Sequence, residues 1–174
     1  MSVSLILTVI GDDRPGLVEQ LATTISQYHG NWLESSMSNL SGKFAGIVCV
    51  SIAEPQLAAL TGALAALPGL RITSEVSRAA ATAAGVRRFK LSLVGHDRIG
   101  IVREVSQVLA RHGINVEDLS THTASAPMSA ELLFHASAEL TASSTLDVGR
   151  LTSDLENLSN DLMVDITLDD GLAA

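Results

Sequence analysis

The stretch Gly11-Asp12-Asp13-Arg14-Pro15-Gly16-Leu17-Val18 occurs twice in this chain of 174 residues. Its second copy, Gly95-His96-Asp97-Arg98-Ile99-Gly100-Ile101-Val102, lies at a constant offset of 84 residues, so that Asp97 corresponds to Asp13. Each copy follows an apolar run and opens an amphipathic run, which predicts a turn between a strand and a helix. Because the first N–H groups of a helix lack partners, such a turn can hold a small anion.

The residues around the first copy alternate between strand patterns and helix patterns. Apolar residues recur at helical spacing after the turn and again from Pro55, which is expected to start the second of two helices. Alternating and β-branched runs predict four strands, so the first half has the order βαββαβ. The expected strands cover residues 3–10, 32–40, 44–52 and 71–76, with a hairpin turn at 41–43.

Local signals also predict how the first helix begins and ends. Asp13 suits the N-cap and Pro15 suits the first turn, where a missing N–H costs nothing. Gly30 is expected to close the helix in the left-handed conformation.

The same order of elements repeats in the second half. The helix after the second copy is expected to end at Gly113, and a Ser-Thr cluster offers caps for the helix that contains Leu151, Leu155 and Leu158. The expected strands cover 89–93, 116–123, 129–138 and 162–169, with a turn at 124–127.

A βαββαβ unit places two helices on one face of a four-stranded, mainly antiparallel sheet, so we predict an α+β protein of two ferredoxin-like units. The expected boundaries are 1–78, an alanine-rich linker at 79–86, 87–170, and a frayed tail at 171–174. Each unit leaves one sheet face and two edges uncovered. Such surfaces favour pairing with the other half or with a second chain, and we expect a homo-oligomer, a dimer being the simplest.

Composition limits the classes of partner. The chain is 47% hydrophobic and 17% charged, as folded proteins are, and its net charge is −8. The only adjacent basic pair is Arg87-Arg88, so direct nucleic-acid binding is not expected. No apolar run approaches the roughly 20 residues that cross a membrane. A single cysteine, Cys49, is expected to be buried and suits a reducing cytoplasm.

Two βαββαβ units, each with an Asp-Arg-(Pro/Ile)-Gly-(Leu/Ile)-Val turn, resemble tandem ACT domains. The first turn fits the usual motif of that family closely, whereas the second departs from it at Ile99. Without an attached enzyme domain, the chain is similar to the glycine cleavage system transcriptional repressor type. The resemblance implies a cytoplasmic regulator that responds to a small amino acid, glycine being the candidate, and controls transcription through a partner protein.

The resemblance also implies where the amino acid binds. Its carboxylate would lie against the turn, an asparagine would contact it, and Asp12 or Asp13 could face its ammonium group. The alternative is structural: Asp13 and Asp97 cap helices, the glycines serve the turns, and each asparagine closes a helix. The implied ligand residues are Gly11, Asp12, Asp13, Arg14, Pro15, Gly16 and Asn31, and in the second half His96, Asp97, Gly100 and Asn115.

Catalysis has no support in the sequence. No common catalytic or nucleotide-binding motif is present, and the five histidines do not have the spacing of zinc ligands. We therefore expect no enzyme, no metal and no cofactor. Two other interpretations stay open: an ACT interaction module that binds no ligand, and an allosteric regulatory subunit of an amino-acid metabolic enzyme.

Overall fold

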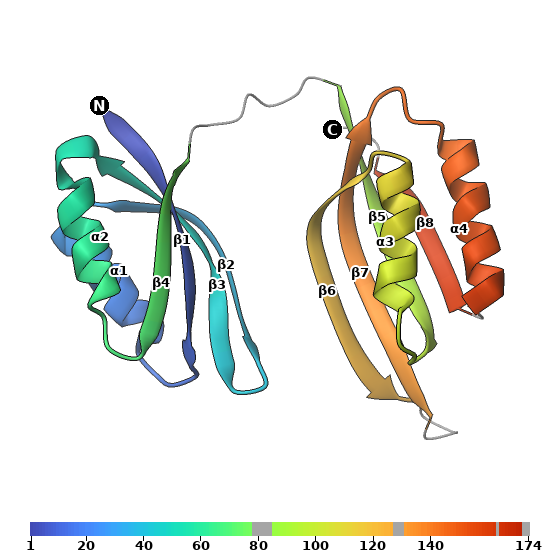
Figure 1. Ribbon diagram of the computed structural model, residues 1–174, viewed down its shortest axis with the longest axis horizontal. Coiled ribbons are helices and arrows are strands. Elements are labelled where there is room, and N and C mark those ends of the chain that lie inside the picture. The colour runs from blue at the N-terminus through green and yellow to red at the C-terminus, as the bar shows by residue number, and fades with distance from the viewer. Residues whose placement is uncertain (78–84, 127–130, 163, 172–174) are drawn as a thin grey trace. The chain divides into compact units, whose positions relative to one another are not determined.

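The computed structural model describes residues 1–77, 85–126, 131–162 and 164–171. The chain divides into two compact units, Met1–Ala81 and Thr82–Ala174, which we call unit 1 and unit 2. In each unit, two helices lie on one face of a four-stranded sheet (Figure 1). The predicted fold class of two ferredoxin-like domains is therefore confirmed.

Unit 1 has the strand order β2-β3-β1-β4, and every neighbouring pair is antiparallel. A short 3₁₀ turn, Glu54–Gln56, precedes its second helix, so that helix begins after Pro55 rather than at it. The elements are β1 (Ser2–Asp12), α1 (Leu17–Gln27), β2 (Asn31–Leu40), β3 (Lys43–Ala53), α2 (Leu57–Ala65) and β4 (Leu70–Ser77).

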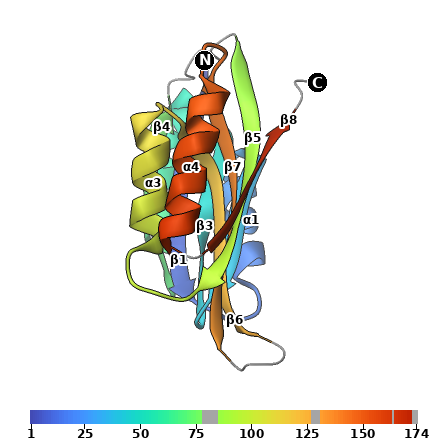
Figure 2. The same cartoon turned by 90° about the vertical axis from the view of Figure 1, so that its right-hand side faces the viewer.

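Unit 2 repeats this arrangement with the strand order β6-β7-β5-β8. Its two helices lie next to each other over the sheet (Figure 2). The elements are β5 (Val86–His96), α3 (Ile101–Arg111), β6 (Asn115–Ser125), β7 (Leu132–Ser143), α4 (Val148–Leu162) and β8 (Val164–Gly171).

Each unit has its own apolar core between helices and sheet. In unit 1, Leu5, Leu7 and Val9 alternate along β1 toward the helices and pack with Leu21 of α1 and Leu60 of α2, all almost fully buried. Burying one such side chain contributes about 1.5–3 kcal/mol. In unit 2 the corresponding core includes Phe89, Leu91, Leu93, Val105, Leu109, Leu151 and Leu155.

The predicted cap at Asp13 is wrong. The N-cap of α1 is Gly16, whose φ of 89° is left-handed, and Pro15 lies before the helix. The same holds in unit 2, where Gly100 rather than Asp97 precedes α3 with a φ of 99°. A glycine turns the chain sharply from strand into helix at no steric cost. Neither N-cap residue makes a side-chain hydrogen bond to its helix.

The predicted role of Gly30 is also wrong. His29 has the left-handed backbone, with a φ of 60°. Gly30 is required for another reason: a Cβ there would lie 2.8 Å from Cγ2 of Ile25. Asn31 and Asn115 begin β2 and β6, so neither closes a helix.

Several predicted boundaries shift. Lys43 begins β3 instead of ending the turn, and Leu162 ends α4 instead of opening the last strand. Ala124 and Ser125 belong to β6, whereas the rest of the predicted turn reaches residues 127–130, which lie outside the described ones. The predicted third strand, 129–138, is Leu132–Ser143.

Three further expectations are affected. The linker at 79–86 falls mostly outside the described residues, and its last residue already belongs to β5. Residues 172–174 of the tail are not described either. Cys49 is half-buried rather than buried, because it points to the sheet face that the helices leave open.

Candidate ligand site at the first turn

The first turn is formed where β1 ends beside the hairpin of β2 and β3. Asp12 pairs with Lys43 in the β1–β3 register, and their side chains form an ion pair. The hydrogen bond and the charge of the Lys43 ammonium hold the pKa of the Asp12 carboxyl below its usual range. Both side chains are exposed, so the pair is accessible to a ligand that carries charges of its own.

The next two residues are committed to contacts within unit 1. The backbone N–H of Asp13 donates to the carbonyl of Gly42 at 2.9 Å, and its carboxylate accepts a hydrogen bond from the Asn39 amide. Nη2 of Arg14 lies 3.1 Å from Oε1 of Gln20 and 3.2 Å from the Pro68 carbonyl oxygen. Arg14 therefore ties the turn to α1 and to the loop before β4.

A cavity of about 350 Å³ opens beside this turn. It is lined by Gly11 and Asp12 from the turn, by Lys43 from β3 and by Arg71 from β4. Gly11 must be a glycine here, because a Cβ would lie 2.3 Å from the Gly69 carbonyl oxygen. The cavity thus places one carboxylate among two cations, which suits a zwitterion.

Arg71 links this cavity to a second, shallow one of about 580 Å³ on the open face of the sheet. Thr8, Thr73 and Ile47 line the second cavity. Among the residues that the structure describes, the Arg71 guanidinium makes no hydrogen bond or ion pair. An uncommitted guanidinium between two cavities is a good partner for a carboxylate.

The structure does not bring Asn31 to this turn within one unit. Asn31 lies opposite Ser51, which pairs with Ser4 of β1, eight residues from Asp12. At about 3.3 Å per strand residue, that separation is roughly 26 Å. Asn31 can contact a ligand at a turn only if the turn belongs to another unit.

The second turn differs in its charges. Arg98 forms an ion pair with Glu104 at 2.8 Å, whereas Arg14 in unit 1 meets the neutral Gln20. The His96 imidazole lies 3.8 Å from the Glu131 carboxylate, and the Asp97 N–H donates to the Leu132 carbonyl at 3.0 Å. The Arg98 charge is therefore already neutralised inside unit 2. Asn115 again lies far from its own turn, opposite Thr141.

Sequence reasoning did not identify Lys43, Arg71 or Asn39 as parts of this site. Lys43 is predicted in the hairpin turn, and only the pairing of β1 with β3 places it beside Asp12. Arg71 and Asn39 were expected in strands without an assigned face. The strand register, which the sequence determines only weakly, decides which polar side chains meet at the turn.

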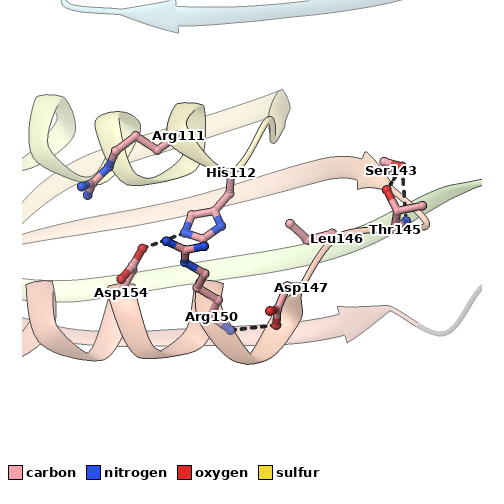
Figure 3. Close-up of a pocket in the computed structure, with 8 residues that line it drawn as sticks. All are labelled: Arg111, His112, Ser143, Thr145, Leu146, Asp147, Arg150 and Asp154. Carbon is pink, nitrogen blue, oxygen red and sulfur yellow. Dashed lines mark hydrogen bonds and ion pairs between the residues drawn. The ribbon is translucent and has the colours of Figure 1, made fainter.

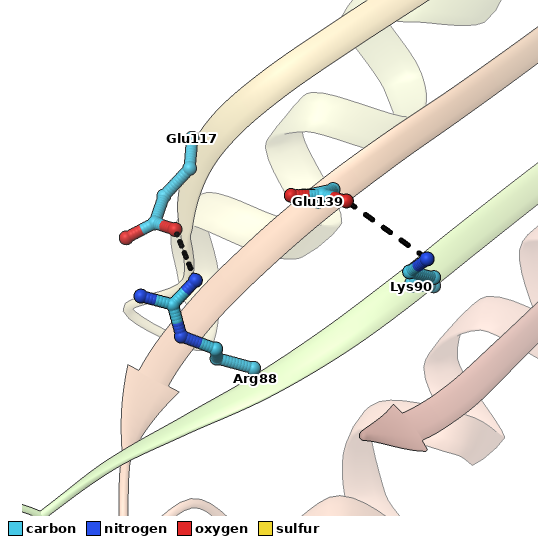
Figure 4. Close-up of polar contacts among 4 residues, drawn as sticks. All are labelled: Arg88, Lys90, Glu117 and Glu139. Atoms are coloured by element: carbon cyan, nitrogen blue, oxygen red, sulfur yellow. Dashed lines mark hydrogen bonds and ion pairs between the residues drawn. The ribbon is translucent and has the colours of Figure 1, made fainter. Parts of the chain in front are cut away.

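The open sheet faces of the two units differ in chemistry. In unit 1 the face is apolar at its centre, with Ile6, Ile10, Ala45 and Ile47 on neighbouring strands. In unit 2 it carries ion pairs, Arg88 with Glu117 at 3.3 Å and Lys90 with Glu139 at 3.9 Å (Figure 4).

Within the described ranges, no group of three or more His, Cys, Asp or Glu side chains is placed to hold a metal ion. His122 and His135 stack at 4.7 Å across β6 and β7, and they are two ligands only. None of the described helices is long and apolar enough to span a membrane.

Comparison with known proteins agrees with this architecture. The sequence profile of the ACT domain matches residues 4–78 and 88–169. The crystal structure of an unknown protein from Galdieria sulphuraria aligns with a TM-score of 0.85 at 30% identity, over 99% of this chain and 100% of that chain. A comparison with curated proteins finds no significant match.

A second crystal structure is described as that of a "putative glycine cleavage system transcriptional repressor". It aligns with a TM-score of 0.72 at 19% identity, over 97% of each chain. At this identity the likeness concerns the fold alone. Both alignments cover nearly the whole length of this chain and therefore include both units.

Proposed function

We propose that this chain, which belongs to the ACT domain family, is a non-enzymatic regulatory protein that binds a small amino acid at the first turn of unit 1. The observation that carries the proposal is the 350 Å³ cavity with Asp12, Lys43 and Arg71 in its wall. The carboxylate of an amino acid would contact Lys43 and Arg71, and its ammonium group would contact Asp12. This arrangement exchanges one internal ion pair for charge-assisted contacts with the ligand.

We propose that a second unit completes the site. Asn31 is about 26 Å from its own turn, so it can approach a ligand only from a neighbouring copy. The apolar centre of the open face of unit 1 supports such an assembly, because exposed Ile47 and Ile10 lose contact with water when another surface covers them. A homo-oligomer, with a dimer as the simplest case, is therefore part of the proposal.

The turn of unit 2 fits a structural role better than a binding role. Glu104 neutralises Arg98 there, and Ile99 is 99% exposed at the position where unit 1 has Pro15. If only one turn binds, we expect it to be Gly11–Gly16. His96, Asp97, Gly100 and Asn115 would then maintain the fold of unit 2.

We further propose that the response reaches transcription through a partner protein in the cytoplasm. The net charge of −8 and the ion pair that occupies Arg88 argue against direct contact with DNA phosphates. Ligand binding would favour the state whose turn and interface it contacts best, and only that difference in affinity can change the partner surface. Glycine is the first amino acid to test, given the description of the similar fold.

Isothermal titration of the full chain with a panel of amino acids that includes glycine tests the proposal. We expect saturable binding of at least one small amino acid at millimolar concentration or below. No binding across the panel would overturn the sensor function and favour an interaction module without a ligand. A pull-down with and without the bound amino acid would then identify the partner and show whether its binding responds.

A further inference from the structure

A cavity of about 460 Å³ lies in unit 2 between the end of α3 and the start of α4 (Figure 3). Arg111 and His112 approach it from α3, and Asp147, Arg150 and Asp154 approach it from α4 and the loop before it. Because α3 has 11 residues, it is roughly 16 Å long, and the second turn lies at its other end. This cavity is therefore distinct from either turn.

Both carboxylates at this cavity already have partners. Oδ2 of Asp154 lies 2.8 Å from Nε2 of His112, and Oδ1 of Asp147 accepts a hydrogen bond from the Arg150 backbone N–H at 3.0 Å. The His112 bond, assisted by the charges of His112 and both arginines, holds the pKa of the Asp154 carboxyl below its usual range. One oxygen of each carboxylate is therefore engaged inside unit 2.

The guanidinium groups of Arg111 and Arg150 differ from these hydrogen-bonded carboxylates. Within the part of the chain that the structure describes, the Arg111 and Arg150 guanidinium groups make no hydrogen bond or ion pair. Arg111 and Arg150 line the cavity from α3 and from α4, respectively (Figure 3).

These charges are specific to unit 2 and are not a consequence of the repeated fold. Gln27 and Tyr28 stand 84 residues before Arg111 and His112, at the same positions of α1. The bond between His112 and Asp154 ties the two helices together. Arg111 and Arg150 add positive charge beside Asp154 and take no part in that bond. In a chain of net charge −8, two uncommitted guanidinium groups at one cavity point to an anionic ligand.

We propose that the cavity between α3 and α4 is a second binding site, which takes a small molecule through a phosphate or carboxylate group. Arg111 and Arg150 would contact the anionic oxygens. His112, held in place by Asp154, would face the same group. This inference does not depend on amino-acid binding at the first turn.

The test is an NMR titration of the ¹⁵N-labelled full chain with inorganic phosphate, with chloride as the control for ionic strength. We expect saturable shifts of the backbone amides of Arg111, His112 and residues 147–150. R111Q and R150Q should each weaken phosphate binding on the order of tenfold or more, because each removes a charge-assisted contact. K90Q, which removes the same charge from the open sheet face, should bind phosphate like the unmodified chain.

The proposal would be overturned if the amide shifts did not saturate. It would also be overturned if K90Q weakened phosphate binding as much as R111Q and R150Q do. Because both arginines are exposed, their replacement should leave the remaining spectrum unchanged. Competition then separates the two ligand chemistries. Displacement of phosphate by acetate supports a carboxylate ligand, and no displacement supports a phosphate ligand.

Discussion

His29 in unit 1 and Gly113 in unit 2 occupy the same position of the repeat, and both have a left-handed backbone, with φ of 60° and 66°. A left-handed conformation costs a residue with a Cβ about 1–2 kcal/mol, and it costs glycine little. His29 is exposed, so its side chain contributes little packing to offset that cost.

We therefore expect His29→Gly to raise the free energy of unfolding of unit 1 by about 1 kcal/mol. The reciprocal change, Gly113→His, should lower the free energy of unfolding of unit 2 by a similar amount. Native-state hydrogen exchange of the strand amides reports each unit separately in the full chain. Equal protection in all three proteins would contradict the expectation.

Gly11 gives a second test, because two strands approach closely there. In Gly11→Ala the new Cβ would lie 2.3 Å from the Gly69 carbonyl oxygen and 2.9 Å from Cδ2 of Leu70. We expect a loss of about 1–3 kcal/mol in the stability of unit 1, measured by urea denaturation.

Gly62 in α2 is the matched control for Gly11. A Cβ at Gly62 meets nothing within 4 Å, so Gly62→Ala should stabilise unit 1 by about 0.5–1 kcal/mol. If Gly11→Ala lowered the stability of unit 1 no more than Gly62→Ala does, the close approach of β1 to the loop before β4 would be wrong.

The repeat and the fold could be predicted from the sequence. Apolar periodicity predicts the strands and helices, and the turn residues indicate where they are connected. Leu5, Leu7 and Val9 identify both a strand and its buried face. The cap at Gly16 and the left-handed His29 were missed because several residues near a helix end suit each position. Asp12, Lys43 and Arg71 lie on three different strands. They meet only through the register of those strands, and local sequence patterns do not determine a register between strands that are far apart in the chain.

Asp154 gives a prediction about pH. Its folded-state pKa lies below the ordinary value of 3.8, and the His112 hydrogen bond is the main cause. A depressed carboxyl pKa contributes stability that is present above the ordinary value and is lost as the pH falls through the folded-state value. Unit 2 should therefore lose this contribution only in acid below the ordinary aspartate range.

In H112Q, NMR titration of the carboxyl carbons should show the pKa of Asp154 raised toward its ordinary value. The pKa of Asp12 should stay low in the same spectra, because its cause is Lys43 in the other unit. An unchanged titration of Asp154 would show that the arginine charges, not the His112 bond, lower its pKa.

Arg71 tests the proposed amino-acid site directly. If its guanidinium contacts the ligand carboxylate, Arg71→Gln should weaken glycine or any other amino acid bound in the panel by roughly tenfold or more. Arg71→Lys keeps the charge and should retain part of the affinity. Calorimetry on the full chain measures both, with Lys90→Gln as the charge-matched control. Unchanged affinity in Arg71→Gln would exclude the proposed position of the carboxylate.

Ile47 tests the proposed assembly through the open face of unit 1. Ile47 is 54% exposed near the centre of that face. Thr23 is exposed in the middle of α1, on the helix side of the same unit and away from the first turn. If the open face is an interface, Ile47→Asp buries an unpaired carboxylate and should raise the dissociation constant of the oligomer by roughly a hundredfold or more. Thr23→Asp introduces the same charge outside the interface and should leave assembly unchanged. Sedimentation velocity distinguishes the outcomes, and equal dissociation constants for Ile47→Asp and the unmodified chain would place the interface elsewhere.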